Sequence, residues 1–195
     1  MFTLDGSIKF VNVDTQYLNL LHQACPEVQY QPYNYTNKPY IGILLADNAH
    51  KYVIPLSSAK PKYTLCADIE QERFLIFELV SLNVLSERAI YKSNDNPTDS
   101  RVKHILSMLD VKKMIPVTDK VIRIVNLNYD PSDNDALKKY KSLLNKEYTF
   151  CIKIKHLILN AANTLYEEQI TSGTVKKYCC DFRLLEQICD SYTTV

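Results

Sequence analysis

Short hydrophobic runs and alternating hydrophobic and polar positions fill the first two thirds of the chain, a pattern typical of β-strands. Asp47 and Asn48 are turn residues between two of these runs, so the flanking segments are expected to form a hairpin. The pattern predicts strands at residues 8–13, 40–46, 51–57, 73–80, 88–92, 113–117 and 121–127, of which 88–92 is the weakest.

Hydrophobic residues three or four positions apart predict short helices in other parts of the chain. These are a helix capped by Asp14 that buries Tyr17, Leu18 and Leu21, a helix near residues 101–109, and a last helix from Asp181 that buries Phe182, Leu185 and Ile188. Between them, a continuous hydrophobic stripe begins at Asp133 or Asp135. It predicts one long helix or a pair with a break near Asn145, and Gly173 is a natural stop.

The order of these elements, β-rich first and helical afterwards, predicts an α+β fold. A length of 195 residues suits a single compact domain over residues 1–195. The strands are short and follow one another closely, so we expect a small, strongly bent antiparallel sheet or barrel. A long C-terminal helical region would complete the domain.

Charge is unevenly divided along the chain. Hydrophobic residues make up 46% and charged residues 23%, as in globular domains, and the formal net charge is +1. This balance excludes a highly basic, histone-like binder. Residues 1–99 nevertheless carry a net charge of −3 and residues 100–195 one of +4. The second half can therefore still present a phosphate-binding face.

Several classes of function are disfavoured by what the sequence lacks. The first residues show no secretory signal, and no apolar run of about 18 residues predicts a membrane span. Only three glycines are present, which excludes the glycine-rich loops that cradle nucleotide cofactors. The six cysteines and four histidines lack metal-site spacing. We therefore expect no metal, no cofactor and free thiols in a reducing cytoplasm.

A serine–lysine cluster at residues 57–60 carries the best candidate chemistry. In an extended chain Ser58 and Lys60 point to one face and Ser57 points away. A hydroxyl and an ammonium group side by side suit a phosphate, because each donates hydrogen bonds to its oxygens. The spacing alone fits an ordinary polar strand end at least as well. No histidine has an assigned place in this chemistry.

Tyrosines and lysines offer a second set of candidates. Tyr30, Tyr33, Tyr35 and Tyr40 precede the hairpin, and unpaired bases stack well on exposed rings. Half-buried tyrosines are equally normal in a protein core. Lysines between residues 138 and 155 lie away from the hydrophobic stripe, where they either solvate a helix or follow a phosphate backbone.

Four blocks of sequence resemble the ToxN/AbiQ family of type III toxin–antitoxin endoribonucleases. They are IKFVNVDTQYLNLL (8–21), KPYIGILL with HKYVIPLSSAKPK (38–45 and 50–62), DVKKMIPV (110–117) and CDFRLLEQICDSY (180–192). The four blocks are spread over nearly the whole chain, and their order and spacing strengthen the resemblance. Residues 63–100 and 128–178 match only loosely, and Ala59 stands where relatives often carry proline.

The resemblance implies a curved β core with added helices, similar to the Kid/MazF ribonuclease toxins. It also implies metal-independent RNA cleavage that leaves a 2′,3′-cyclic phosphate and a 5′-hydroxyl. The catalytic positions it implies are Tyr17, Lys38, Ser57, Ser58 and Lys60. For RNA binding we expect Tyr33, Tyr35, Tyr40, Lys62, Lys112, Lys113, Lys138, Lys139 and Lys141.

The expected partner is a structured antitoxin RNA encoded as repeats, which forms a closed protein–RNA assembly with the toxin in a bacterial cytoplasm. The substrates would be cellular or phage RNA, and the role would be abortive infection. Three alternatives remain open. They are a MazF-like ribonuclease with a protein antitoxin, a non-catalytic nucleic-acid-binding module, and a serine–lysine amidase or esterase, which would lack the usual nucleophile-elbow glycines.

Overall fold

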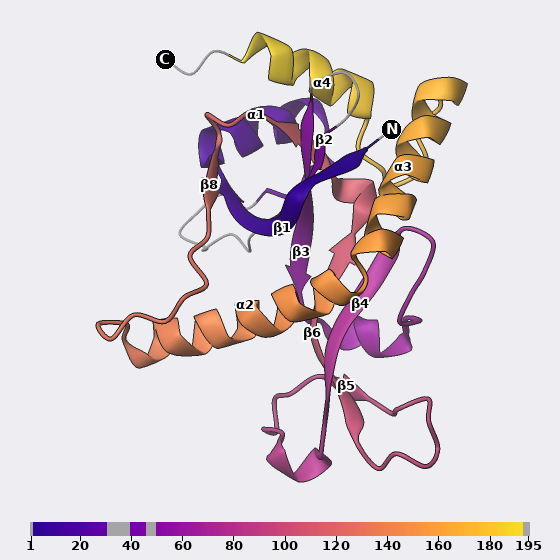
Figure 1. Ribbon diagram of the computed structural model, residues 1–195. Helices are drawn as coiled ribbons and strands as arrows, with labels where there is room; N and C mark the ends of the chain where they lie inside the picture. Colours follow the sequence, from indigo (N-terminus) through magenta and orange to yellow (C-terminus); the bar gives the residue numbers. More distant parts are fainter. Residues whose placement is uncertain (1, 31–39, 46–49, 193–195) are drawn as a thin grey trace.

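The computed structural model describes residues 2–30, 40–45 and 50–192. Within these residues one antiparallel sheet is covered by four α-helices, which confirms the α+β class (Figure 1). The sheet order is β4-β6-β3-β2-β1-β8, with β5 paired to β6 and β7 to β3. The strands are β1 Thr3–Val13, β2 Tyr40–Leu45, β3 Lys51–Ser58, β4 Arg73–Val80, β5 Tyr91–Lys92, β6 Val102–Asp110, β7 Ile115–Val117 and β8 Ile122–Ile124; the helices are α1 Thr15–Ala24, α2 Asp135–Lys153, α3 Lys155–Ser172 and α4 Phe182–Ser191.

The first strand and helix form as the sequence predicts. The Asp14 carboxylate accepts hydrogen bonds of 2.9 Å from the backbone N–H groups of Gln16 and Tyr17, which caps α1. The helix then buries Tyr17, Leu18 and Leu21 against the sheet. Burial of this hydrophobic face fixes the end of α1, and with it the segment that follows, beside β3.

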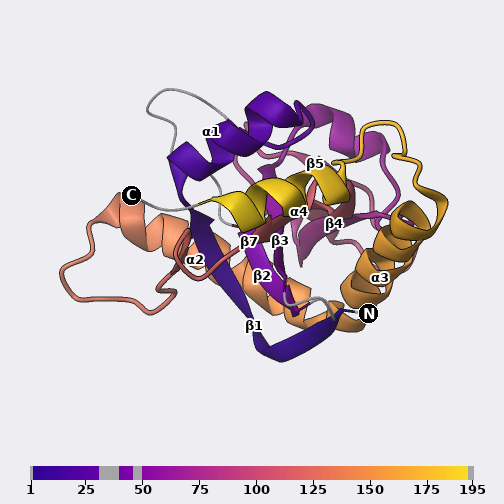
Figure 2. The same ribbon diagram turned by 90° about the horizontal axis from the view of Figure 1, so that it is seen from above.

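Strand β3 lies at the centre of the molecule and joins two parts of the sheet. On one side it pairs with β2, which confirms the predicted hairpin; its Asp47–Asn48 turn lies outside the described residues. On the other side its first half pairs with β7 and its second half with β6. Register shifts in the β2–β3 and β4–β6 pairs bend the sheet, as bulges do. β3 therefore changes partner midway along its length, and its end at Ser58 lies beside β6. Helix α4 lies over β7, the partner of the first half (Figure 2).

The prediction of a helix near residues 101–109 was wrong, because these residues form strand β6. Leucine, methionine and lysine favour helices in isolation, but here tertiary pairing overrides that preference. β6 pairs with β4 along its whole length and also with β3 and β5. Residues 105–109 are all buried, so both faces of this part of the strand are covered.

The helical third follows the predicted stripe but breaks later than expected. Asn134 caps α2, and the helix continues past Asn145 to Lys153, where Ile154 separates it from α3. Gly173 ends α3 with φ +67°, in the left-handed conformation that glycine adopts without strain. α2 crosses the sheet near β4 and β6, and the β4–β5–β6 ribbon extends beyond it (Figure 1).

The last helix closes the hydrophobic core. Asp181 caps α4 by accepting a 3.1 Å hydrogen bond from Leu184 N, and Phe182 and Leu185 are buried as predicted. The hydroxyl of Tyr52 in β3 donates a 2.8 Å hydrogen bond to Glu186 of α4. This bond ties the C-terminal helix to the central strand. No helix within the described residues is long and apolar enough to cross a membrane.

Candidate active site

A pocket of about 400 Å³ lies at the end of β3 and brings together Ser57, Ser58 and Lys60. Successive residues of a strand point to opposite faces, so a pocket that reaches both serines wraps around the strand end. Ser57, expected to point away, therefore belongs to the same site. The full lining within the described residues is His22, Pro26, Glu27, Val28, Gln29, Tyr30, Tyr40, Pro55, Leu56, Ser57, Ser58, Lys60 and Lys113.

Ser57 is held by hydrogen bonds from the opposite wall of the pocket. The Gln29 side-chain Nε2 donates a 3.0 Å hydrogen bond to Ser57 Oγ. The buried Tyr40 hydroxyl in turn donates a 3.0 Å bond to the backbone carbonyl of Gln29. Tyr40 thus supports the pocket wall with a buried ring, whereas it was expected to contact RNA directly. Burial raises the pKa of Tyr40, which keeps its hydroxyl protonated as this donor requires.

The chain turns sharply after Lys60 and places a second hydroxyl near Ser57. Residues Pro61–Leu65 form a 3-10 turn with Pro61 in its first turn, and this turn buries Tyr63. Burial raises the pKa of Tyr63, and a hydrogen bond with Ser57 opposes that rise. Ser57 Oγ therefore contacts polar groups from both sides, which fixes its position.

Two of the described lysines, Lys60 and Lys113, line the pocket and differ in their ion pairing. Lys113 makes an ion pair with Glu27, another lining residue. Lys60 is exposed, and no carboxylate of the described residues pairs with it. An unpaired ammonium beside two hydroxyls is a set of donors suited to phosphate oxygens. The electrostatics of the pocket therefore favour an anionic ligand at the Lys60 side.

Tyr17, expected among the catalytic residues, does not line this pocket. Its side chain is fully buried between α1, β7 and the end of α4. The hydroxyl donates a 2.8 Å hydrogen bond to the Pro116 carbonyl. Burial raises the pKa of Tyr17 far above its usual value. This geometry makes Tyr17 a support that joins α1 to β7.

The predicted RNA-binding residues are dispersed. Tyr33 and Tyr35 lie outside the described residues, and so does Lys38, which was predicted to be catalytic. Lys62 is exposed with its ammonium 6.0 Å from the centroid of the Tyr63 ring. Lys112 lies 3.6 Å from a carboxylate oxygen of Glu72, on the β6–β7 connection. Of the lysines predicted to bind RNA, all of which the structure describes, Lys113 alone lines the pocket.

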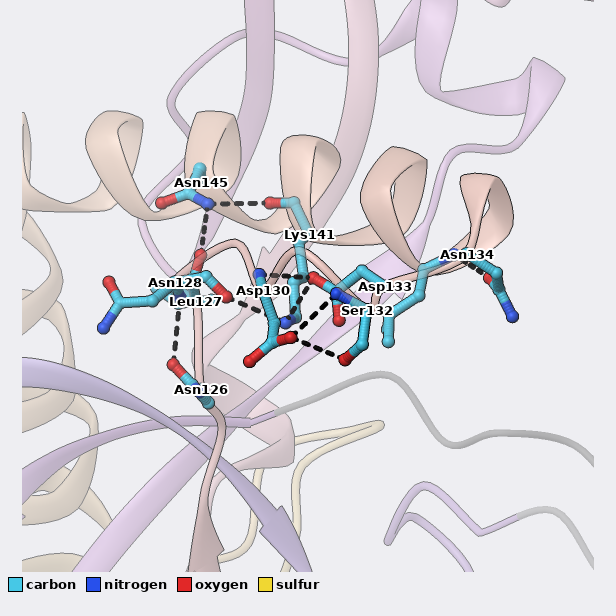
Figure 3. Close-up of polar contacts among 10 residues, drawn as sticks. Asn126, Leu127, Asn128, Asp130, Ser132, Asp133, Asn134, Lys141 and Asn145 are labelled. Atoms are coloured by element: carbon cyan, nitrogen blue, oxygen red, sulfur yellow. Dashed lines mark hydrogen bonds and ion pairs between the residues drawn. The ribbon is translucent and has the colours of Figure 1, made fainter.

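The lysines of α2 have different surroundings. Lys138 and Lys139 are exposed on its first turns, as an RNA-contacting surface requires. Lys141 is buried instead, with its ammonium 2.7 Å from Asp133 Oδ2 and 2.8 Å from the Asn128 carbonyl (Figure 3). The expectation that Lys141 contacts RNA conflicts with this burial, because its donors already organise the loop before α2.

The site residues that the sequence patterns did not indicate come from the last turn of α1 and the segment after it. His22, Glu27 and Gln29 face the serines across the pocket although they are about 30 positions away in the sequence. The local signal that points toward them is the helix cap at Asp14, since it fixes where α1 begins. Within the part of the chain that the structure describes, no three His, Cys, Asp or Glu residues are grouped to hold a metal ion.

Comparison with known proteins gives a consistent result. A family model described as "Toxin ToxN, type III toxin-antitoxin system" matches residues 9–190. The endoribonuclease ToxN of Bacillus thuringiensis subsp. kurstaki is 26% identical over 191 residues, which cover 94% of this chain and 84% of that protein. The endoribonuclease AbiQ of Lactococcus lactis subsp. lactis is 27% identical over 186 residues, covering 92% and 86%.

The solved structures agree with these relatives. One, from work on selective toxin inhibition by a non-coding RNA pseudoknot, superposes with a TM-score of 0.70 at 22% identity. It covers 95% of this chain and 98% of that chain. At this identity the likeness establishes a shared fold. The family match over most of the chain and the shared fold are the basis on which the pocket can be interpreted.

Proposed function

This chain belongs to the ToxN family of toxins from type III toxin–antitoxin systems, and we propose that it is an endoribonuclease whose active site is the pocket at the end of β3. The curated relatives from Bacillus thuringiensis and Lactococcus lactis are both endoribonucleases, and the alignments span most of each chain. The observation that carries the proposal is that Ser57, Ser58 and Lys60 line one pocket and that no carboxylate of the described residues pairs with Lys60.

The chemistry we assign to this pocket is an internal transfer within the RNA. The 2′-oxygen of the substrate attacks the adjacent phosphorus, and the bond from phosphorus to the 5′-oxygen breaks. The proton lost by the 2′-hydroxyl is balanced by one gained at the 5′-oxygen. The products are a 2′,3′-cyclic phosphate and a 5′-hydroxyl, and the reaction requires neither a metal nor an enzyme nucleophile.

The residues of the pocket act as donors to the charge that develops during this reaction. The phosphorane transition state carries more negative charge on its oxygens than the substrate, so fixed donors stabilise it preferentially. Lys60 supplies a positive charge, and Ser58 and Ser57 supply hydroxyl groups. Lys38 is assigned to the same site by family resemblance. Tyr17 acts as a positioning residue through its bond to Pro116.

The proposed partner is a structured antitoxin RNA that covers the pocket and forms a closed protein–RNA assembly with the toxin. One solved neighbour comes from work on toxin inhibition by an RNA pseudoknot, and the basic second half of this chain suits such a partner. Exposed Lys138 and Lys139 would contact its phosphates. We propose a role in phage defence in a bacterial cytoplasm, with cellular or phage RNA as the substrate.

Two further proposals concern the fold itself, namely its relationship to other toxins and its single domain. The bent antiparallel sheet covered by helices is consistent with a relationship to the Kid/MazF ribonuclease toxins. The packing of α4 against β7 and α1 supports a single domain over residues 1–195, because the last helix completes the core begun by the first.

The proposed function is tested by incubating the purified protein with RNA and analysing the ends of the products. We expect cleavage by the wild type, and cleavage slower by ~10²–10³ by Ser58→Ala, at equal protein concentration and equal helical content. Co-purification of RNA from the native locus, rather than a small protein, would distinguish a type III antitoxin from the protein antitoxin of a MazF-like system.

A further inference from the structure

The wall of the pocket opposite Ser58 and Lys60 has no part in the chemistry described above. Among the described residues it is formed by the end of α1 and the segment up to Tyr30, and it carries the aromatic rings of His22 and Tyr30. We propose that these two rings form a subsite for an unpaired nucleobase beside the scissile phosphate and so determine which RNA sequence is cleaved. This inference rests on the proposed function.

The two rings form a fixed aromatic surface. Their centroids lie 5.6 Å apart and their planes are tilted by 39°. Both residues are half-buried, so each keeps part of its ring accessible while the rest packs against the protein. A rigid, partly exposed aromatic surface can stack with a base at little cost in side-chain entropy.

The orientation of His22 is set by a backbone contact. Its Nδ1 lies 2.8 Å from the carbonyl oxygen of Val28, and a carbonyl can only accept a hydrogen bond. Nδ1 therefore carries the hydrogen, and Nε2 of the neutral ring is left as an acceptor. That acceptor can bind an exocyclic amino group of a base, which adds hydrogen-bond selectivity to stacking.

A base fits this part of the pocket better than a second phosphate does. Lys113 is already paired with Glu27, so the charge on this side is balanced. The volume of about 400 Å³ lies within the range of about 300–1,000 Å³ that is usual for small-ligand sites. Proteins that read single-stranded RNA combine aromatic stacking with hydrogen bonds to base edges. The rings on one wall would contact the base of a nucleotide, and the donors on the other wall would contact its phosphate.

The test begins by mapping the cleavage sites of the wild-type protein in RNA. A short oligonucleotide of the preferred sequence is then made with a 2′-deoxy sugar at the cleaved position, which prevents the reaction. Each base near that position is removed in turn to give abasic oligonucleotides. Their dissociation constants are measured with the wild type, Tyr30→Ala, Tyr30→Phe and the control Tyr91→Ala, which removes an exposed ring on β5.

Stacking of one base predicts a specific pattern. Tyr30→Ala should weaken binding of the complete oligonucleotide roughly 5- to 150-fold. For the oligonucleotide that lacks the stacked base next to the scissile phosphate, Tyr30→Ala and the wild type should have the same dissociation constant. Tyr30→Phe should bind like the wild type, because it keeps the ring. With cleavable RNA, Tyr30→Ala should raise KM and leave kcat unchanged.

Two results would overturn the subsite. One is equal weakening by Tyr30→Ala whichever base is removed, which indicates a structural role. The other is wild-type affinity of Tyr30→Ala on every oligonucleotide. If the wild type cleaves no RNA in the mapping step, the proposed function itself fails. That outcome is distinct from cleavage that does not depend on Tyr30.

Discussion

The side-chain amide of Gln29 donates a 3.0 Å hydrogen bond to Ser57 Oγ across the pocket. The bond joins the segment after α1 to the end of β3. If Ser57 assists the reaction, Gln29→Ala should lower kcat about fivefold, since one neutral hydrogen bond contributes about 1 kcal/mol. Single-turnover cleavage measures this effect. Gln23→Ala, on the exposed face of α1, is the control, and equal rates for the two variants would show that the bond does not matter for catalysis.

Substitution of Tyr17 can distinguish a structural role of this residue from a catalytic one. Tyr17→Phe removes the hydroxyl that donates to the buried Pro116 carbonyl, so the free energy of unfolding should fall by about 1–3 kcal/mol. Urea denaturation measures this loss. Cleavage at a temperature where the variant is folded should stay within about threefold of the wild type. A rate loss of ~10²–10³ with unchanged stability would instead identify a group acting on the transition state.

Lys141 should affect stability, whereas its neighbour Lys138 should affect RNA binding. Lys141→Met leaves the buried Asp133 carboxylate without its cation, so the melting temperature should fall. Lys138→Met changes an exposed side chain and should melt like the wild type. Thermal unfolding followed by circular dichroism compares the two variants. Equal melting temperatures would mean that the loop before α2 does not need the ion pair.

The same ion pair predicts a dependence on pH. The hydrogen bond from Lys141 holds the pKa of Asp133 below its usual value. A carboxyl group with a lowered pKa stabilises the fold above its unfolded pKa of about 4, and that contribution is lost as the pH falls further. The stability difference between the wild type and Lys141→Met should therefore shrink from pH 6 to pH 3. A difference that stays constant in urea titrations over this range would rule out the linkage.

Lys138 and Lys139 test the antitoxin surface. Reversing both charges to Glu should weaken binding of the native antitoxin RNA and flatten its salt dependence, because each lost phosphate contact lowers the slope by about one. Cleavage of a short oligonucleotide should change little, since these residues lie outside the pocket. A salt titration of RNA affinity measures the slope. An unchanged slope would confine antitoxin contacts to the pocket and its surroundings.

The sequence predicted most elements because local signals were strong. Asp14, Gly173 and Asp181 marked helix ends by capping chemistry that depends on a few neighbouring residues. Residues 101–109 were misassigned because their strand is stabilised by three partners from distant parts of the chain. No window of local sequence contains that information.

Only part of the candidate site could be predicted, because some of its residues are close in the sequence and others meet only in the folded chain. Ser57, Ser58 and Lys60 share one strand end, so their spacing was informative. His22, Gln29 and Lys113 join them only after the chain has folded. Lys141 could not be recognised as buried, because its partner Asp133 lies in a loop whose conformation depends on that same contact (Figure 3).

We propose that RNA is cleaved at the end of β3 by donors that include Ser58 and Lys60. The most direct measurement is single-turnover cleavage of end-labelled RNA in excess EDTA, with product ends identified by mass spectrometry. The wild type should give 2′,3′-cyclic phosphate and 5′-hydroxyl ends, and Ser58→Ala and Lys60→Ala should each be slower by ~10²–10³. The exposed controls Ser86→Ala and Lys120→Ala should match the wild type. Full activity of both Ser58→Ala and Lys60→Ala would show that these donors do not catalyse the cleavage. Wild-type activity that returns only when a divalent ion is added would show that the reaction depends on a metal.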